Sequence, residues 1–245
     1  MNGLVITILT LNVAQGGAHK EERYAAIQQQ MEQAKVDVVC LQEIRRYSAT
    51  STSADGLLPG WHRVIDGHYG NWNQGIFSRY PIKRTVKVPY PTRGARWALG
   101  AVLDVKGKEV LVLTTHLDYA LGATAARTQQ INALFAGAAK FGGPAVVTGD
   151  FNFGDQGPES RAIPKTFTDV FRSLHPDKAG FTWDKERNAE SRRSSLPGEP
   201  SRRLDRILTS KHFGSRSAAL LMTGKVRPGL QFSDHFGVVA QVLLL

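Results

Sequence analysis

The chain has 245 residues, 42% of them hydrophobic and 21% charged, which suits one globular domain with a substantial buried core. Its 31 Lys and Arg residues against 21 Asp and Glu residues give a net charge of +10, so the surface attracts anions such as nucleic acids, phosphorylated small molecules or acidic lipid headgroups. A single cysteine excludes an intrachain disulfide, and no apolar run approaches the roughly 20 residues that span a bilayer.

From these features we expect one domain over residues 1–245 and a monomer without a transmembrane segment. We expect a cytoplasmic location, because nothing calls for an oxidising compartment. A secreted protein whose leader has been removed would have the same composition, so that alternative stays open.

Apolar runs rich in β-branched residues predict eight strands. In chain order they are 4–13, 37–44, 73–82, 97–105, 109–117, 143–151, 202–210 and 236–245. Residues 20–35 and 123–141 contain helix formers with apolar residues about 3.6 positions apart, which predicts two helices. Many strands with few helices indicate antiparallel or mixed sheets covered by helices, so we expect an α+β layered domain.

Two further stretches allow a local prediction. Cys40, between Val39 and Leu41 in a strand, is expected to behave as a small buried hydrophobic residue. Residues 185–203 are polar, rich in Arg and Ser and interrupted by two prolines, which predicts a long mobile loop. A solvated surface insertion is the first interpretation, and a substrate-facing loop is the alternative because the segment precedes Asp205.

Polar residues recur where the apolar runs end. They are Asn12, Glu43, His116, Asp118, Asp150, Asn152, Asp205, Asp234 and His235. One such residue is usually a cap or a turn former. So many together are hard to explain by turn chemistry, because the ends of these runs should meet at one edge of the sheets.

This set contains the groups that metal-assisted hydrolysis of a phosphate ester requires. Carboxylate and amide oxygens are the ligands that Mg²⁺ prefers. The sequence has neither a cysteine cluster nor the His spacing of a zinc site. The remaining groups can orient a water molecule, stabilise charge on phosphorus oxygens and protonate a leaving oxygen.

Seven short motifs, in order, carry a resemblance to a known family. They are "TLNV", "LQEI", "IFSRYPI", "TTHLD", "TGDFN", "LDRIL" and "SDHFGV". Together they resemble the endonuclease/exonuclease/phosphatase superfamily, whose fold is a DNase I-like four-layer α/β sandwich of two packed mixed β-sheets flanked by helices. Within it, "GFTWDKERN" followed by "RRLDRIL" resembles the 5′-tyrosyl-DNA phosphodiesterase branch. The chain departs from that branch in "LTLNV" and "GDFN", where Thr-Trp-Asn and Gly-Asp-Thr-Asn are usual, and these differences concern the leaving group.

The resemblance implies a site for Mg²⁺ or Mn²⁺. Glu43 corresponds to the principal metal ligand, with Asn12 and Asp234 completing the site directly or through water. Asp150 and Asn152 are similar to the pair that positions and activates the attacking water.

The two site histidines have separate implied roles. His235 would contact the scissile phosphate, with Asp205 holding its ring and favouring the imidazolium. His116 would contact phosphate or act as the acid for the leaving oxygen.

The sequence defines the substrate-binding residues less closely than the catalytic ones. Trp183 is either a core or lid residue or a wall on which substrate stacks, and Arg96, Arg202 and Arg203 are expected along a groove for a nucleic-acid backbone. Arg127 and Gln130 on the second helix are expected to brace the loop after His116 and are interpreted as structural.

Three functions follow for comparison. The first is a metal-dependent phosphodiesterase acting on nucleic acid, at DNA ends or adducts. The second is a phosphoesterase acting on a lipid or soluble phosphorylated headgroup. A catalytically inactive binding module is disfavoured because every catalytic position carries a competent residue.

Overall fold

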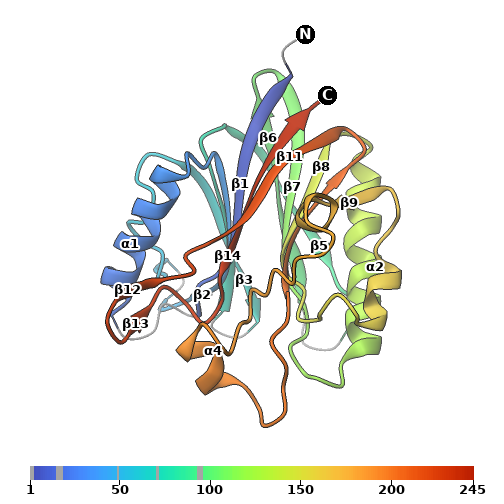
Figure 1. The fold of residues 1–245 in the computed structure, drawn as a ribbon. Coiled ribbons are helices and arrows are strands. Elements are labelled where there is room, and N and C mark those ends of the chain that lie inside the picture. Colours follow the sequence, from blue (N-terminus) through green and yellow to red (C-terminus); the bar gives the residue numbers. More distant parts are fainter. Residues whose placement is uncertain (1–2, 15–18, 49, 70–71, 93–95) are drawn as a thin grey trace.

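Two six-stranded sheets form the centre of the computed structural model, which describes residues 3–14, 19–48, 50–69, 72–92 and 96–245 (Figure 1). The first sheet has the order β11 (Phe213–Leu221), β14 (Gly237–Leu244), β1 (Leu4–Asn12), β2 (Val38–Arg45), β4 (Trp72–Ser78) and β3 (His62–Tyr69). The second has the order β5 (Ile82–Pro89), β6 (Trp97–Val105), β7 (Lys108–His116), β8 (Ala145–Asp150), β10 (Asp205–Ser210) and β9 (Phe167–Asp169). Both sheets are mixed, because the β1–β2 and β7–β8 pairs are parallel and the other neighbours are antiparallel.

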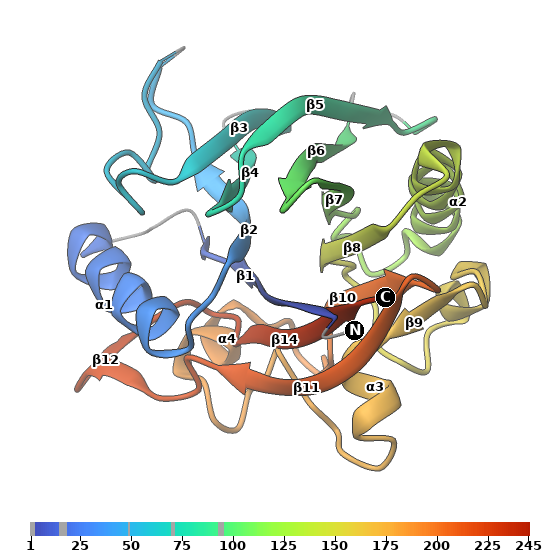
Figure 2. The same ribbon diagram turned by 90° about the horizontal axis from the view of Figure 1, so that it is seen from above.

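Two long helices, α1 (Lys20–Gln33) and α2 (Thr124–Phe141), lie on opposite sides of the molecule. The other elements are short: the 3₁₀ helix η2 (Pro158–Ala162), α3 (Val170–Leu174), α4 (Ala189–Ser194) and the hairpin of β12 (Lys225–Arg227) and β13 (Leu230–Gln231). Seen from above, α1 lies outside the first sheet and α2 outside the second (Figure 2). Among the residues that the structure describes, no helix combines the length and the apolar character needed to cross a membrane.

Three apolar clusters hold the four layers together. Ile8 and Cys40 of the first sheet pack against Val112 of the second in the central cluster. Leu9 of β1 belongs instead to the cluster beneath α1, and a third cluster lies beneath α2. Ile8 and Leu9 are neighbours that point to opposite faces, as the two-residue period of a strand requires. Both faces of β1 are therefore buried, which explains its nearly continuous apolar sequence.

The expected α+β sandwich is confirmed, and all eight predicted strands and both predicted helices are present. Cys40 is fully buried and unpaired, as expected. The interpretation of residues 185–203 as one loop is wrong, because this segment contains α4. The Asn188 side chain caps the start of α4 by accepting N–H groups from Glu190 and Ser191.

Candidate active site

The second sheet brings three predicted site residues into one row. His116 ends β7, Asp150 ends β8 and Asp205 begins β10. His116 lies opposite Asp150 in one ladder, and Asp150 lies opposite Asp205 in the next. Opposite residues place their side chains on the same face of a sheet. Gly149 permits this close pairing, because a Cβ there would lie 2.0 Å from the Thr115 carbonyl oxygen.

The first sheet supplies Asn12 and Glu43, and a β-bulge turns Glu43 inward. The register of β2 against β4 shifts between Leu41 and Ile44. Two residues of β2, Gln42 and Glu43, therefore occupy the place of one residue in the ladder, which is a β-bulge. Glu43 has a φ of 58°, a left-handed conformation that costs a non-glycine residue roughly 1–3 kcal/mol. Regular alternation would place Glu43 on the face that packs beneath α1. The bulge instead brings Glu43 Oε1 to 3.1 Å from Asn12 Nδ2.

The chain just before β14 carries Asp234 and His235, and Ser233 fixes its position. The Ser233 hydroxyl donates to the Asn12 carbonyl oxygen at 2.6 Å and accepts the His235 backbone N–H at 3.2 Å. Asn188 donates from Nδ2 to the Ser233 carbonyl oxygen at 2.9 Å. This segment is therefore fastened both to β1 and to the region around α4.

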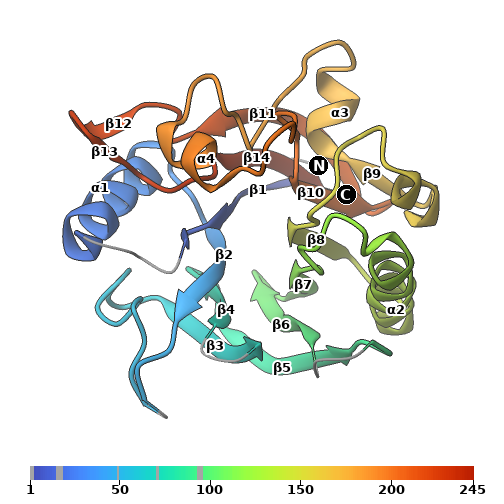
Figure 3. The same cartoon turned by 90° about the horizontal axis from the view of Figure 1, so that it is seen from below.

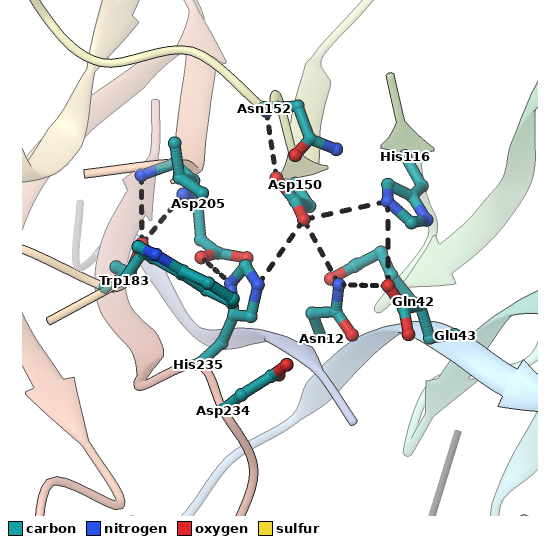
Figure 4. A network of polar contacts seen from close by, with 12 residues as sticks. Asn12, Gln42, Glu43, His116, Asp150, Asn152, Trp183, Asp205, Asp234 and His235 are labelled. Carbon is teal, nitrogen blue, oxygen red and sulfur yellow. Dashed lines mark hydrogen bonds and ion pairs between the residues drawn. The ribbon is translucent and has the colours of Figure 1, made fainter. Parts of the chain in front are cut away.

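Asp150 is the centre of the polar network (Figure 4). Its Oδ2 accepts from Asn12 Nδ2 at 3.1 Å, and its Oδ1 accepts the Asn152 backbone N–H at 2.9 Å. The Nε2 atoms of His116 and His235 each lie 3.7 Å from Oδ2. Burial alone would raise the pKa of Asp150, but His235, His116 and these hydrogen bonds hold it below its ordinary value. Asp150 is thus a buried carboxylate between two imidazoles.

His235 and Asp205 form a buried pair. His235 Nδ1 lies 2.8 Å from Asp205 Oδ2, and Asp205 is fully buried. Burial opposes a charged imidazole, but the Asp205 and Asp150 carboxylates raise the pKa of His235 well above its ordinary value. The structure therefore favours an imidazolium whose Nδ1–H donates to Asp205 and whose Nε2–H is directed toward Asp150 (Figure 4).

His116 lies in a different electrostatic environment. Burial lowers the pKa of its imidazole to about 4, and the nearby Arg96 guanidinium acts in the same direction against the opposing effect of Asp150. Its ring is parallel to that of Trp72 within 4°, with centroids 6.1 Å apart. At neutral pH the His116 ring is therefore uncharged.

Glu43 and Asp234 are half-buried carboxyl groups with raised pKa values. Burial and the carboxylate of Asp234 raise the pKa of Glu43 to about 7, and burial also raises the pKa of Asp234. His235 is already engaged by Asp205 and Asp150. The neighbouring carboxylates of Glu43 and Asp234 offer oxygen donors that suit a hard divalent cation, so these two residues fit that group. Asn12 directs its NH₂ group toward the Glu43 and Asp150 carboxylates.

A second combination of possible ligands is less suitable. Among the described residues, Asp150, Asp205 and His235 place ligand atoms within 4.8 Å of one another. The Nδ1 atom of His235 is already hydrogen-bonded to Asp205, and the raised pKa keeps the ring protonated. A protonated imidazole is not a metal ligand. We therefore interpret this group as an ion-pair network.

The site opens into a cavity of about 650 Å³. The predicted residues that line it are Glu43, His116, Asp150, Asn152, Trp183, Arg202, Asp234 and His235. Asn12 and Asp205 lie behind these groups and are almost completely buried. The Asn12 oxygen accepts the Ala14 backbone N–H at 3.0 Å, so Asn12 presents its NH₂ group to the carboxylates.

Several apolar cavity residues were missed by the search for polar residues at strand ends. Trp72 begins β4 beside His116, and Tyr119, Leu121 and Leu196 are each more than half exposed where they line the cavity. The rings of Trp183 and His235 meet edge to face, with centroids 5.0 Å apart. The exposure of three large apolar side chains beside a polar floor is visible only in the folded chain.

The three predicted substrate-binding arginines have different positions. Arg202 lines the cavity, where Glu199 pairs with its guanidinium. Arg96 is buried and donates to the Leu117 carbonyl oxygen at 3.2 Å. Arg203 is 3% exposed and is enclosed by Asp155 and Asp169, with its Nη2 2.7 Å from Asp169 Oδ2. The prediction that Arg203 lies along a surface groove is wrong, because internal carboxylates occupy its donors.

The structural role expected for Arg127 and Gln130 is confirmed. Arg127 Nη1 donates to the carbonyl oxygens of Asp118 and Ala120 at 3.0 and 2.7 Å. The Gln130 side-chain oxygen accepts the Asp118 backbone N–H at 3.0 Å. Both residues therefore hold the loop that follows His116.

Comparisons with known proteins agree with this geometry. The model of the Endonuclease/Exonuclease/phosphatase family matches residues 9–235. Tyrosyl-DNA phosphodiesterase 2 from Homo sapiens is 25% identical over 257 residues, covering 98% of this chain and 69% of that protein. The Bos taurus protein of the same name is 27% identical over 218 residues, covering 83% of this chain and 58% of that protein.

The fold is shared with a solved structure described as Danio rerio TDP2 complexed with single-strand DNA product. The two superpose with a TM-score of 0.83 at 20% identity, covering 97% of this chain and 98% of that chain. The expected resemblance to the tyrosyl-DNA phosphodiesterase branch is thus confirmed. Because the family model spans nearly the whole chain, this protein belongs to the Endonuclease/Exonuclease/phosphatase family, a family of hydrolases that act on ester bonds.

Proposed function

We propose that this protein is a phosphodiesterase, dependent on Mg²⁺ or Mn²⁺, that hydrolyses phosphate ester bonds in nucleic acid at DNA ends or adducts. One observation carries the proposal: a buried carboxylate, Asp150, lies between a charged and an uncharged imidazole on the floor of an open cavity. This arrangement offers a base, a cation and a neutral hydrogen-bonding group within a few ångströms.

Asp150 is the candidate base for the attacking water. Its low pKa keeps it ionised, and the N–H groups of Asn12 and Asn152 fix both of its oxygens. Asn152 itself has a φ of 56° and donates from Nδ2 to the Leu117 carbonyl oxygen at 3.1 Å. This fixed geometry supports a role in orienting water, because a base must lie within hydrogen-bond reach of the proton that it accepts.

The two histidines are suited to different contacts with the phosphate. His235, held as an imidazolium by Asp205, can stabilise the charge that develops on the phosphate oxygens. His116 is a neutral imidazole at neutral pH in the free protein, since its pKa is about 4, so it lacks the second ring proton that a general acid would transfer. Of the two roles expected for His116, contact with the phosphate is therefore better supported than that of the acid.

A divalent cation held by Glu43 and Asp234, with Asn12 beside them, would act as a Lewis acid toward the phosphate oxygens. Without it, four carboxylates, those of Glu43, Asp150, Asp205 and Asp234, share the site with one imidazolium. Burial is the main cause of the raised pKa values of Glu43 and Asp234, and neighbouring carboxylates raise them further. Binding of a cation should therefore stabilise the folded protein as well as support turnover.

A nucleic-acid substrate is favoured by the net charge of the protein and by the aromatic residues that line the cavity. The net charge of +10 attracts a polyanion, and the cavity presents Trp72, Trp183 and Tyr119, whose rings suit contact with a base. The similarity to proteins named tyrosyl-DNA phosphodiesterase 2 supports DNA ends as the place of action.

The metal requirement is tested with bis-p-nitrophenyl phosphate. Hydrolysis should stop in excess chelator and return with Mg²⁺ or Mn²⁺, and Glu43→Gln should require much more metal for half-maximal activity. His62→Ala changes an exposed histidine of β3 that does not line the cavity and should behave as wild type. Full activity in chelator would refute the metal assignment.

The substrate is tested by direct comparison. A single-stranded oligonucleotide with a 5′-tyrosyl phosphodiester should be cleaved with a far higher kcat/KM than bis-p-nitrophenyl phosphate. Vesicles containing sphingomyelin or phosphoinositides should remain intact under the same conditions. Preference for a lipid headgroup over the oligonucleotide would replace the nucleic-acid proposal by a lipid phosphoesterase on the same fold.

A further inference from the structure

Thr182 connects the two partners of the buried His235–Asp205 pair. Its side chain is fully buried, and its Oγ1 accepts the backbone N–H groups of Leu204 at 2.9 Å and Asp205 at 3.1 Å. Its carbonyl oxygen accepts the backbone N–H of Phe236, the residue after His235, at 2.8 Å. One residue therefore holds the backbone on both sides of the hydrogen bond between His235 and Asp205.

The two held segments belong to different sheets. Asp205 begins β10 in the second sheet, whereas His235 precedes β14 in the first. In the part of the chain that the structure describes, no backbone ladder joins these sheets, so their relative position at this edge depends on packing and on side-chain contacts. The view from below shows β10 and β14 beside each other near α4 (Figure 3). Thr182 supplies hydrogen bonds across this junction, where strand pairing supplies none.

The first residues of β10 also have no partner strand on the side of β9. Its neighbour β9 pairs only with residues Leu208 to Ser210, so β9 does not reach Asp205. The Thr182 hydroxyl takes the place of a strand there by accepting two successive N–H groups. A buried N–H group without a partner is costly, so this side chain determines where the Asp205 backbone can lie.

Thr182 can hold the segments around Asp205 and His235 in place because its own backbone is fixed by hydrogen bonds. The N–H groups of Thr182 and Trp183 both donate to the Arg202 carbonyl oxygen, and the Arg202 N–H donates to the Trp183 carbonyl oxygen at 2.8 Å. The Trp183 ring in turn makes an edge-to-face contact with the His235 ring. The imidazole is thus confined by the segment that also holds its carboxylate partner.

We propose that Thr182 is a positioning residue for hydrolysis: its hydroxyl sets the Asp205 carboxylate against His235 Nδ1 and thereby aims the imidazole at the phosphate. The role in hydrolysis rests on the proposed function, whereas the effect on the Asp205–His235 contact does not. Thr182 lies behind the pair and is not assigned a contact with substrate. Its removal should therefore affect turnover more than substrate binding.

The test uses a pair of variants of the full chain. Thr182→Val keeps the shape of the side chain and removes the hydroxyl, whereas Thr182→Ser keeps the hydroxyl. We expect Thr182→Val to lower kcat on the oligonucleotide about 10- to 100-fold with KM changed less than about threefold, and Thr182→Ser to restore kcat to within about threefold of wild type. Thr209→Val is the matched control, because Thr209 is a buried threonine of β10, the strand that Asp205 begins, and its hydroxyl has no hydrogen-bond partner among the described residues. It should behave as wild type.

A double-variant cycle separates positioning from a general loss of stability. If Thr182 acts through Asp205, Thr182→Val should reduce kcat little further in an Asp205→Asn background. Multiplicative losses, or a wild-type kcat for Thr182→Val, would overturn the proposal. Should Thr182→Val not fold, Thr182→Ala, which leaves room for a water molecule at the two N–H groups, provides the same comparison with Thr182→Ser.

Crystal structures of the Val and Ser variants give a readout that does not depend on activity. The Asp205 Oδ2 to His235 Nδ1 separation should exceed hydrogen-bond distance in Thr182→Val and remain near the 2.8 Å of the wild type in Thr182→Ser. An unchanged contact in Thr182→Val would overturn the proposal. If the wild-type protein hydrolyses neither test substrate, the proposed function fails and this structural comparison decides the role of Thr182 by itself.

Discussion

Replacing Asp155 by Asn should destabilise the fold through a cluster of three arginines. The Asp155 carboxylate accepts from Arg172 Nη2 at 2.5 Å, from Arg203 Nε at 3.1 Å and from Arg206 Nη2 at 3.3 Å. Arg203 and Arg206 are almost fully buried, and Asp169 is the one other carboxylate among the described residues that pairs with them. A buried charge that loses its partner is strongly destabilising.

The size of this loss of stability follows from the lowered pKa of Asp155. Although burial acts in the opposite direction, Arg203, Arg206 and Arg172 lower the pKa of Asp155 to about 2 from an ordinary value of 3.8. This difference corresponds to about 2.4 kcal/mol. Solvent reaches 27% of the side chain, so we reduce the charge contribution to about 1–2 kcal/mol. The poorly compensated Arg206 adds to this, for a total of about 2–3 kcal/mol.

The assay is urea unfolding followed by circular dichroism. With a slope of about 3 kcal/mol per molar urea, the midpoint should fall by roughly 0.7–1 M. Because the pKa is lowered in the folded state, this stabilisation is complete above about pH 4 and is lost as the pH falls toward 2. The gap between wild type and Asp155→Asn should therefore narrow over that range. Glu109→Gln, which removes an exposed partner of Arg84 and Lys83, is the control. A midpoint for Asp155→Asn equal to that of the control would refute the reasoning.

Further predictions concern the site. His235→Ala and Asp150→Ala should each lower kcat by about two to four orders of magnitude while the far-ultraviolet circular dichroism stays unchanged. Asp205→Asn should cost less than His235→Ala, and the double variant should resemble His235→Ala alone; multiplying effects would contradict the pairing. In a protein inactivated by Asp150→Asn, Arg202→Ala should make oligonucleotide affinity less dependent on salt without changing the urea midpoint. Arg203→Ala should lower the midpoint instead, and equal behaviour of the two variants would contradict their assigned positions.

The strands that the sequence predicts are those buried on both faces. Segments such as β1 and β7 are nearly continuous runs of apolar residues because each lies between two layers. The strands that escaped prediction are edge or half-exposed strands. β5 carries Lys83, Arg84 and Lys87, and β11 is polar where it faces solvent. Charged edge strands prevent pairing between molecules, and this same composition hides them from a hydrophobic pattern.

The active-site residues were predictable where a regular strand ends in a polar residue. His116 and Asp150 follow this rule, since each closes an apolar strand. Glu43 follows it only because of the bulge in β2, which no pattern of alternation predicts. Thr182 lies within the quoted motif "GFTWDKERN" but was assigned no role, because its residue type does not show that its hydroxyl accepts two backbone N–H groups. Trp72 was passed over because a strand-end search for polar groups ignores aromatic ones.

Arg202 and Arg203 show why charge alone could not define the substrate surface. The two residues are adjacent at the entry to β10, where successive side chains point to opposite sides of an extended chain. Arg202 consequently lines the cavity beside Glu199, whereas Arg203 turns inward to Asp155 and Asp169. The carboxylates that receive Arg203 come from the turn after β8 and from β9, which lie far from it in sequence. The arginine-rich segment thus directs one guanidinium into the cavity and the other to an internal ion pair, and the location of the half-buried Asp155 and Asp169 decides which is which.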